Sequence, residues 1–325
     1  MAEWLYEEGI GENRAILIEN GRIVEAQIEL PGEIRPGAVV PARLTLIMVA
    51  GRRGLAALDG GEAIVEPLPP QLTQGQAIRV EIVREAIAEP GRPKLAKCRF
   101  SEEAPREGLT LAQRIGPHTR LGPHAPDALE EAGWSELLEE AGTGEIPFRG
   151  GALRMSLTPA MTLFDVDGGL PPAELAIAGA EAAGRAIRRF GIGGSIGIDL
   201  PTLAGKAERQ AAAAALDAVL PQPFERTAVN GFGFLQIVRR RERASLPELL
   251  QGDPVGAASR ALLRRAERAP GIGERVLHAA PAVTARLEAN RAWLDTLASR
   301  VGAPVALRAD PRLAISGGHV HSRPA

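Results

Sequence analysis

Two apolar segments of the chain each lead into an aspartate. Asp165 follows the apolar residues of "MTLFDVDGG" (161–169), and Asp199 follows those of "GSIGIDLP" (194–201). The residues between them have a helical pattern, so the two strands should lie side by side and bring both carboxylates to one sheet edge. Two like charges so close need a cation, and hard oxygen ligands favour Mg²⁺ or Mn²⁺. Such an ion activates water and stabilises charge on a phosphoryl group. The alternative is that each aspartate only caps a following helix or turn.

Other candidate residues give weaker signals. The glycine-rich "GIGGSIG" (191–197) precedes a strand, which predicts a helix end rather than a phosphate-binding loop. The basic run "RRRER" (239–243) either contacts phosphates or is the solvated end of a strand. His319 and His321 lie on one face of a strand with no acid or cysteine partner in view, so metal ligation there is the minor alternative. Cys98 is expected to be a small buried residue.

Composition limits the classes of protein to consider. The 325 residues are 45% hydrophobic, enough for two or three domains with real cores. A single cysteine excludes an intrachain disulfide framework and a four-cysteine zinc site. No apolar run approaches the ~20 residues of a membrane span. The first residues, "MAEWLYEEGIGENR", lack the features of a signal peptide, so a soluble cytoplasmic protein without membrane contact is expected.

The net charge of −2 conceals an asymmetry along the chain. Residues 1–150 hold 16 Lys and Arg against 24 Asp and Glu, whereas residues 151–325 hold 22 against 16. The second half, at +6, has the charge to bind nucleic acid. A solvated, arginine-rich surface explains the charge equally well.

The first half of the chain is expected to be rich in strands. Residues 14–30 form two strands around the Asn-Gly turn of "ENGR". Many short strands with glycine turns and no helix predict a small β-barrel over 38–100. Residues 101–150 are rich in Pro, Gly and Glu, and we interpret them as a connector with one short helix, "PDALEEAGWSELLEEAG".

From residue 151 the pattern changes to an α/β unit. Two strands are followed by a helix that begins at Pro171 and Pro172 and ends at Gly191. A buried strand, a second helix over 203–220 and a hairpin over 224–240 complete the unit. The remainder, 246–325, is expected to be mainly helical with a late strand, "APVALRAD".

At these residues the chain resembles the ribonuclease E/G family. The resemblance is carried by "FDVDGG" (164–169), "GGSIGIDL" (193–200) and "FGFLQIVRRR" (232–241), in the order in which the family has strands ending in Asp and then a basic strand. The start, "RAILIENGRIVEAQIE", resembles the split first strands of the family's RNase H-like domain. The ending, "VALRADPRLAISGGHVHSR", resembles its small domain.

The resemblance implies an α+β multidomain fold. Its parts would be split RNase H-like strands over 1–37, an inserted OB-type RNA-binding barrel over 38–100, a reduced connector over 101–150, an α/β deoxyribonuclease-like catalytic domain over 151–246 and a small, mainly helical α/β domain over 247–325. Asp165 and Asp199 would be the catalytic Mg²⁺ ligands, with Mn²⁺ able to substitute and Asp167 as a third ligand. The residues expected to contact RNA are Phe232, Arg239, Arg241, Arg84, Arg92 and Lys94.

The sequence also departs from the family pattern. Asp167 replaces the family's Asn, Gln236 stands where Glu is usual, and Gly231 stands where Arg often precedes Phe-Gly. Leu55 and Val65 stand where the barrel usually carries stacking aromatic residues, which predicts weaker RNA affinity. The zinc link is absent, so no zinc is expected and any homodimer would form without it. Most of the region that senses the RNA 5′-phosphate is missing too.

We therefore predict a compact, Mg²⁺-dependent endoribonuclease that hydrolyses single-stranded RNA to 5′-phosphate and 3′-hydroxyl ends, in RNA processing or decay. The alternative is a non-catalytic RNA-binding protein on a decayed nuclease scaffold. A third interpretation is a structural α/β protein with no role in RNA metabolism.

Overall fold

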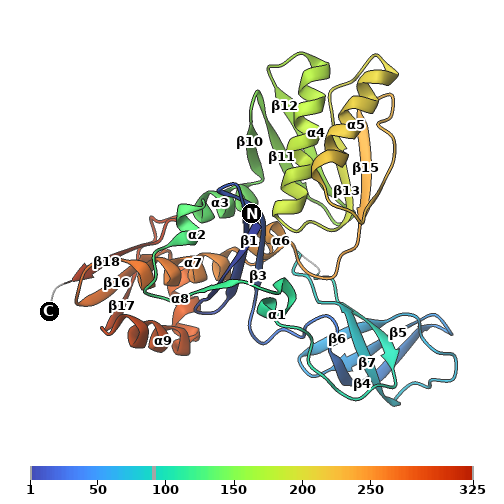
Figure 1. Ribbon diagram of the computed structural model, residues 1–325. Helices are drawn as coiled ribbons and strands as arrows, with labels where there is room; N and C mark the ends of the chain where they lie inside the picture. Colours follow the sequence, from blue (N-terminus) through green and yellow to red (C-terminus); the bar gives the residue numbers. More distant parts are fainter. Residues whose placement is uncertain (1, 90–92, 324–325) are drawn as a thin grey trace.

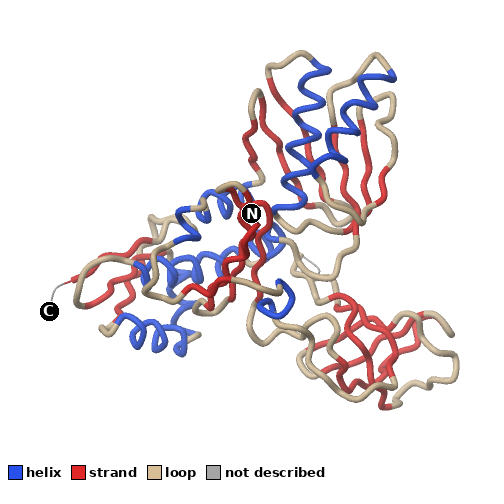
Figure 2. Tube along the Cα trace, viewed as in Figure 1, coloured by secondary structure: helices blue, strands red, loops and turns tan. Residues whose placement is uncertain are grey.

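Three open sheets and one closed barrel organise the chain into an α+β fold in the computed structural model, which describes residues 2–89 and 93–323. Figure 1 shows three lobes around the N-terminal sheet: the six-stranded sheet with its helices, the barrel, and the C-terminal lobe. Figure 2 shows that strands dominate the barrel, whereas helices pack on the other two lobes. No helix in the described ranges is both long and apolar enough to cross a membrane.

The N-terminal sheet has the strand order β3-β2-β1-β9. Its strands are β1 (Ala2–Glu8), β2 (Asn13–Glu19), β3 (Arg22–Glu29) and β9 (Thr119–Leu121). The predicted Asn-Gly hairpin is confirmed: β2 pairs antiparallel with β3, and Asn20 has the positive φ of 51° that such a tight turn requires. β9 adds to the edge as the parallel partner of β1.

The predicted barrel is also confirmed. Five strands close in the order β4-β5-β6-β8-β7. They are β4 (Val39–Val49), β5 (Arg53–Leu58), β6 (Gly61–Val65), β7 (Ala77–Arg84) and β8 (Ala96–Ser101). Alternate residues fill the interior, and Leu44, Val65, Val80 and Cys98 are fully buried there. Because Val65 is a core residue, that position cannot present a base-stacking side chain.

The segment over 101–150 is more structured than the predicted connector. It holds α1 (Leu111–Ile115), β9, α2 (Ala128–Glu131), α3 (Trp134–Thr143) and β10 (Glu145–Phe148). The single expected helix is broken at Gly133, which has a φ of +95°. Trp134 and Leu137 are buried in the largest apolar core, so this segment joins two sheets rather than merely linking domains.

The six-stranded sheet has the order β10-β11-β12-β13-β15-β14. Its remaining elements are β11 (Gly151–Leu157), β12 (Thr162–Gly168), α4 (Pro172–Arg189), β13 (Gly194–Asp199), α5 (Lys206–Val219), β14 (Glu225–Arg226) and β15 (Phe234–Arg239). The predicted strands, both helices and the hairpin are confirmed. β12 and β13 are parallel because α4 carries the chain back between them, and the other neighbours are antiparallel. Figure 1 shows α4 and α5 on one face of this sheet.

The C-terminal lobe packs helices on one face of a three-stranded sheet. Its elements are α7 (Pro254–Arg268), β16 (Glu274–Ala279), α8 (Pro281–Ala289), α9 (Arg291–Val301), β17 (Val305–Ala309) and β18 (His319–Arg323). Helix α6 (Leu246–Gly252) leads into this lobe, but its Leu246 is buried in the largest apolar core. The late strand is confirmed as β17, while β16, the central strand of the order β17-β16-β18, was not predicted. Leu277 of β16 is buried with Leu262, Val283 and Leu297 of the helices.

A buried ion-pair network joins this lobe to the N-terminal sheet. Glu7 on β1 accepts hydrogen bonds from Arg14, from Arg264 Nε at 3.2 Å and from Arg268 Nη2 at 2.5 Å. Burial alone raises the pKa of the Glu7 carboxyl, but these guanidinium groups outweigh it and hold that pKa below its usual range. Arg260 Nε contacts Glu12 at 2.8 Å in the same way.

Candidate functional site

Asp165 and Asp199 are direct neighbours across the parallel pair of β12 and β13, with their Cα atoms in register. Adjacent strands lie about 4.8 Å apart, and residues in register point to the same face. Both side chains are exposed. The sequence placed each aspartate at the end of its strand; Asp199 is the last residue of β13, but Asp165 lies in the middle of β12. The pair therefore lies on a sheet face rather than beyond its edge.

The alternation of each strand decides which face carries the acids. In β12, Phe164 and Val166 are buried, whereas Asp165 and Asp167 are exposed. Ile198, next to Asp199 in β13, is likewise buried. Since α4 and α5 cover the apolar face, the acids occupy the opposite, open face of the sheet. We call Asp165, Asp167 and Asp199 with their neighbour Arg154 the acidic face.

The charges on the acidic face are not equally partnered. Arg154 of β11 is the register partner of Asp165, but its guanidinium pairs with Asp167 at 3.4 Å and with Glu145 at 3.7 Å. Within residues 2–89 and 93–323, the carboxylates of Asp165 and Asp199 make no ion pair or side-chain hydrogen bond. They are thus two adjacent acceptors without a protein donor.

These two carboxylates suit a hard divalent cation. Mg²⁺ commonly binds through one or two carboxylates and keeps several water ligands. The expected metal site of three carboxylates is not assembled. The described residues contain no group of three or more His, Cys, Asp or Glu side chains arranged to hold a metal ion. Asp167, expected as a third ligand, instead pairs with Arg154. The donor set therefore fits a magnesium-type ion held by Asp165 and Asp199 alone.

An aromatic element borders the acid pair. Phe234 of β15 is the register partner of Asp199, and its ring lies over Gly197. A Cβ on Gly197 would lie 2.5 Å from Phe234 Cζ and 2.8 Å from Leu163 Cδ2, so glycine is needed for this close approach. At the tip of the preceding loop, Phe232 is 84% exposed. The loop is held by Asn230, whose Oδ1 accepts hydrogen bonds from the backbone N–H groups of Phe232 at 2.9 Å and Phe234 at 3.0 Å.

Three of the basic residues expected to contact RNA are gathered elsewhere, at the junction of the barrel and the six-stranded sheet. Lys94 and Arg241 line a pocket of about 170 Å³, where both pair with Glu89, and Arg241 also pairs with Glu248. Arg84 Nη2 donates to the Leu95 carbonyl at 2.5 Å. Burial, and then the nearby Arg241, lower the pKa of the Arg84 guanidinium. Lys94 and Arg241 are thus neutralised by carboxylates within the protein, and Arg84 is bound to a backbone carbonyl. Arg92 lies outside the described residues.

Arg239 belongs to a different cluster, which the sequence revealed only in part. Its register partner is Gly194, five residues before Asp199, so it lies about 17 Å along the sheet from the acid pair. Five arginines from three separate segments line one pocket of about 350 Å³, which we call the arginine pocket: Arg114, Arg188, Arg239, Arg240 and Arg243. The basic run over 239–243 was visible in the sequence, but only the fold adds Arg114 and Arg188 to it.

The arginine pocket is only partly neutralised. Arg114 pairs with Glu29 at 2.9 Å, and Arg188 pairs with Glu19 and Glu25, each at 2.9 Å. The Arg239 guanidinium has no ion pair among the described residues and donates only a long hydrogen bond of 3.4 Å to the Ile192 carbonyl. Burial lowers the pKa of that guanidinium. An anionic ligand would supply the partner that Arg239 lacks.

Searches against models of known protein families and against curated proteins find no match to this chain.

Proposed function

We propose that the protein is a metal-dependent endoribonuclease of the ribonuclease E/G type that hydrolyses single-stranded RNA to 5′-phosphate and 3′-hydroxyl ends. The observation that carries the proposal is the adjacent pair of exposed carboxylates, Asp165 and Asp199, which has no donor among the described residues. On this proposal the N-terminal sheet corresponds to split RNase H-like strands, the barrel to an OB-type domain and the six-stranded sheet to a deoxyribonuclease-like catalytic domain.

In this proposal Asp165 and Asp199 hold Mg²⁺, or Mn²⁺ in its place. When bound, the ion supplies an activated water and stabilises charge on the phosphoryl group. Arg154, next to them, limits the negative potential of the face through its pair with Asp167, so a phosphodiester meets less repulsion there.

The aromatic side chains and the arginine pocket would bind the strand. Phe232 is exposed and Phe234 borders the acid pair, so either ring can stack on an unpaired base. Stacking requires a single-stranded substrate, because the bases of a duplex are not accessible. The Arg239 guanidinium would contact a backbone phosphate away from the reacting bond. Single-stranded RNA binding thus combines sequence-tolerant stacking with salt-dependent phosphate contacts.

A second candidate function is non-catalytic RNA binding on the same scaffold. It is favoured by the Asp167–Arg154 pair and by Gln236, which replaces a carboxylate by a neutral amide beside Gly197 on the open face. The ion pair occupies Asp167, and the Gln236 amide supplies no charge, so neither side chain adds an acidic ligand to Asp165 and Asp199. This candidate keeps the stacking and phosphate contacts but predicts no strand cleavage.

One experiment separates the two functions. A labelled single-stranded RNA is incubated with the protein in Mg²⁺, in Mn²⁺ and in EDTA, alongside Asp165→Asn, Asp199→Asn and the surface control Asp295→Asn. We expect cleavage only with a divalent ion, in the wild type and in the control. Binding without cleavage under either metal would favour the second candidate, and cleavage in EDTA would exclude the metal mechanism.

A further inference from the structure

The three-stranded sheet of the C-terminal lobe has one open face. Leu277 and Ala279 of β16 are buried against the helices, so the alternate positions of that strand face outward. The register extends this face across both neighbours, since His278 is opposite Arg308 of β17 and His319 of β18. His321 and Arg323 continue it along β18.

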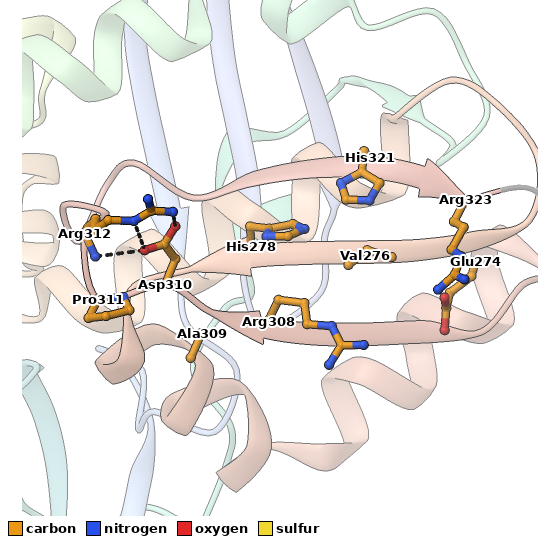
Figure 3. A pocket seen from close by; sticks show the side chains of 10 residues that line it. All are labelled: Glu274, Val276, His278, Arg308, Ala309, Asp310, Pro311, Arg312, His321 and Arg323. Atoms are coloured by element: carbon orange, nitrogen blue, oxygen red, sulfur yellow. Dashed lines mark hydrogen bonds and ion pairs between the residues drawn. The ribbon is translucent and has the colours of Figure 1, made fainter.

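This face forms a hollow of about 530 Å³. Figure 3 shows the side chains of Arg308, His278 and His321 lying over the three strands, with Asp310 and Arg312 at one end and Glu274 and Arg323 at the other. It is separate from both the acid pair and the arginine pocket, since all its lining residues belong to the C-terminal lobe. We call it the histidine hollow.

Three imidazoles meet at the histidine hollow. The ring centroids of His278 and His319 are 4.9 Å apart with nearly parallel planes at 4°, and those of His278 and His321 are also 4.9 Å apart. Nε2 of His278 is buried and has no hydrogen-bond partner within the described ranges. A buried polar atom without a partner indicates a site that another molecule can complete.

Two arginines of the hollow are similarly unpartnered. Arg308 and Arg323 make no ion pair with any residue that the structure describes, and both are exposed. Asp310, by contrast, accepts from Arg312 Nε at 3.0 Å and from Nη2 at 2.8 Å. These hydrogen bonds lower the pKa of Asp310 to about 2, so the pair is internally neutral. Glu274 is the other acid in the hollow, and the unpartnered guanidinium groups leave it with an excess of cationic donors.

We propose that the histidine hollow binds a phosphate group. Guanidinium groups present paired N–H donors that match phosphate oxygens, and an imidazole N–H adds a further donor. A metal ion fits less well, because stacked rings at 4° do not direct their nitrogens to a common point and no metal-holding group occurs among the described residues. The phosphate could belong to an RNA strand or to a free nucleotide. The site does not depend on the ribonuclease activity.

The histidines make this binding depend on pH. Burial, and then the neighbouring His319 and His321, lower the pKa of the His278 imidazole. The charged and titratable groups around His278 come from all three strands and from the loop after β17. They are Glu274, Arg308, Asp310, Arg312, His319, His321 and Arg323. A bound phosphate favours the imidazolium form, so its affinity should increase as pH falls below about 6.5, the ordinary histidine value.

The test is calorimetric titration of the full chain with inorganic pyrophosphate, in EDTA, at pH 7.5 and pH 6.0. The double variant Arg308→Ala/Arg323→Ala should bind at least about tenfold more weakly than the wild type, a difference of ~1.4 kcal/mol. Arg291→Ala removes one exposed arginine from α9 of the same lobe and should change nothing. Because the arginine pocket is a second candidate site for anions, all proteins carry Arg239→Ala as a common background.

The pH arm uses His278→Gln and His321→Gln, which should remove most of the increase in affinity between pH 7.5 and 6.0. If a short single-stranded RNA displaces pyrophosphate, the natural ligand is a phosphate of an RNA strand. If a nucleoside diphosphate displaces pyrophosphate and RNA does not, the ligand is a free nucleotide. Both outcomes support the site. Equal pyrophosphate affinity in the wild type and the double arginine variant overturns it. Stoichiometric binding of Zn²⁺ that requires His278, together with no binding of pyrophosphate, would also overturn the proposal.

Discussion

Asp165 and Asp199 are in-register neighbours on adjacent parallel strands, although 33 other residues separate them in the sequence. Helix α4 returns the chain between these strands, and the alternation of β12 and β13 turns both side chains away from the helices. Two carboxylates fixed side by side repel each other, and a bound divalent cation removes that repulsion. This relationship underlies the proposal that the open face performs metal-dependent chemistry.

Replacing either aspartate by asparagine should abolish most cleavage while preserving RNA binding. An amide is a neutral and weaker ligand, so metal occupancy falls and the rate should decrease by about a hundredfold or more. Removing a negative charge near the phosphates also relieves repulsion, so the dissociation constant for RNA should stay the same or decrease. Cleavage time courses and anisotropy titrations of Asp165→Asn and Asp199→Asn measure both effects. The matched control is Asp295→Asn, at an exposed position of α9. Wild-type cleavage rates in both Asp165→Asn and Asp199→Asn would show that the active site is elsewhere.

Asp167→Asn should be tolerated. Its carboxylate pairs with Arg154 at 3.4 Å rather than joining the acid pair, so the metal should keep its two ligands. We expect a cleavage rate within about threefold of the wild type. Steady-state kinetics at several Mg²⁺ concentrations check this; a large increase in the Mg²⁺ concentration needed for half-maximal rate would mean that Asp167 is a ligand after all.

Gly197→Ala should destabilise the protein and disturb the aromatic border of the site. The new Cβ would lie 2.5 Å from Phe234 Cζ, so the ring must move. Overpacking of this kind lowers the free energy of unfolding by about 1–3 kcal/mol. Urea denaturation measures the loss. Gly122→Ala, where an added Cβ meets nothing within 4 Å, is the control and should change stability little; equal effects of the two substitutions would contradict the packing argument.

The acid pair could be predicted from sequence because local rules determine it. A strand-helix-strand pattern favours parallel neighbours, and apolar residues alternating with acids show which side chains face solvent. The position of Asp165 within β12 was missed because "FDVDGG" continues the strand by three residues beyond the aspartate. Pairing with β11 extends β12 as far as Gly168, the register partner of Gly151.

The arginine pocket and the histidine hollow could not be predicted in the same way. Arg114 and Arg239 are 125 positions apart, and only tertiary packing brings them to one pocket. His319 and His321 were noted as a pair, but their third partner, His278, lies on β16, a strand that the sequence did not reveal. The residues of β16 are mostly buried, so they lack the alternation that marks a half-exposed strand.

Glu7→Gln should strongly destabilise the fold, because it leaves three guanidinium groups around a neutral amide. Breaking a buried ion pair costs about 3–5 kcal/mol. The folded-state pKa of Glu7 lies below its ordinary value, so its contribution is fully present above about pH 4.5 and is lost as pH falls through the folded pKa. Denaturation of Glu7→Gln at pH 7 and pH 4 should therefore show a smaller difference from the wild type at the lower pH. Glu8→Gln, whose partner Arg120 is exposed, should cost no more than about 1 kcal/mol.

Arg239→Ala should weaken RNA binding without changing the chemistry of the acid pair. The guanidinium lies about 17 Å from Asp199 along the sheet and lacks an ion-pair partner among the described residues, so a phosphate is the ligand it can gain. Loss of one phosphate contact should reduce the slope of log affinity against log salt by about one and affect all sequences alike.

The measurement is a set of anisotropy titrations from low to moderate salt, with cleavage at saturating RNA followed in parallel. The matched control is Arg185→Ala, which removes an equal charge from the solvent side of α4, where Arg185 pairs with Glu181. The control should leave the salt slope unchanged. A selective loss of affinity and slope in Arg239→Ala, with the rate at saturation preserved, would assign the arginine pocket to strand binding. Identical slopes for the wild type and both variants would show that the strand does not reach it.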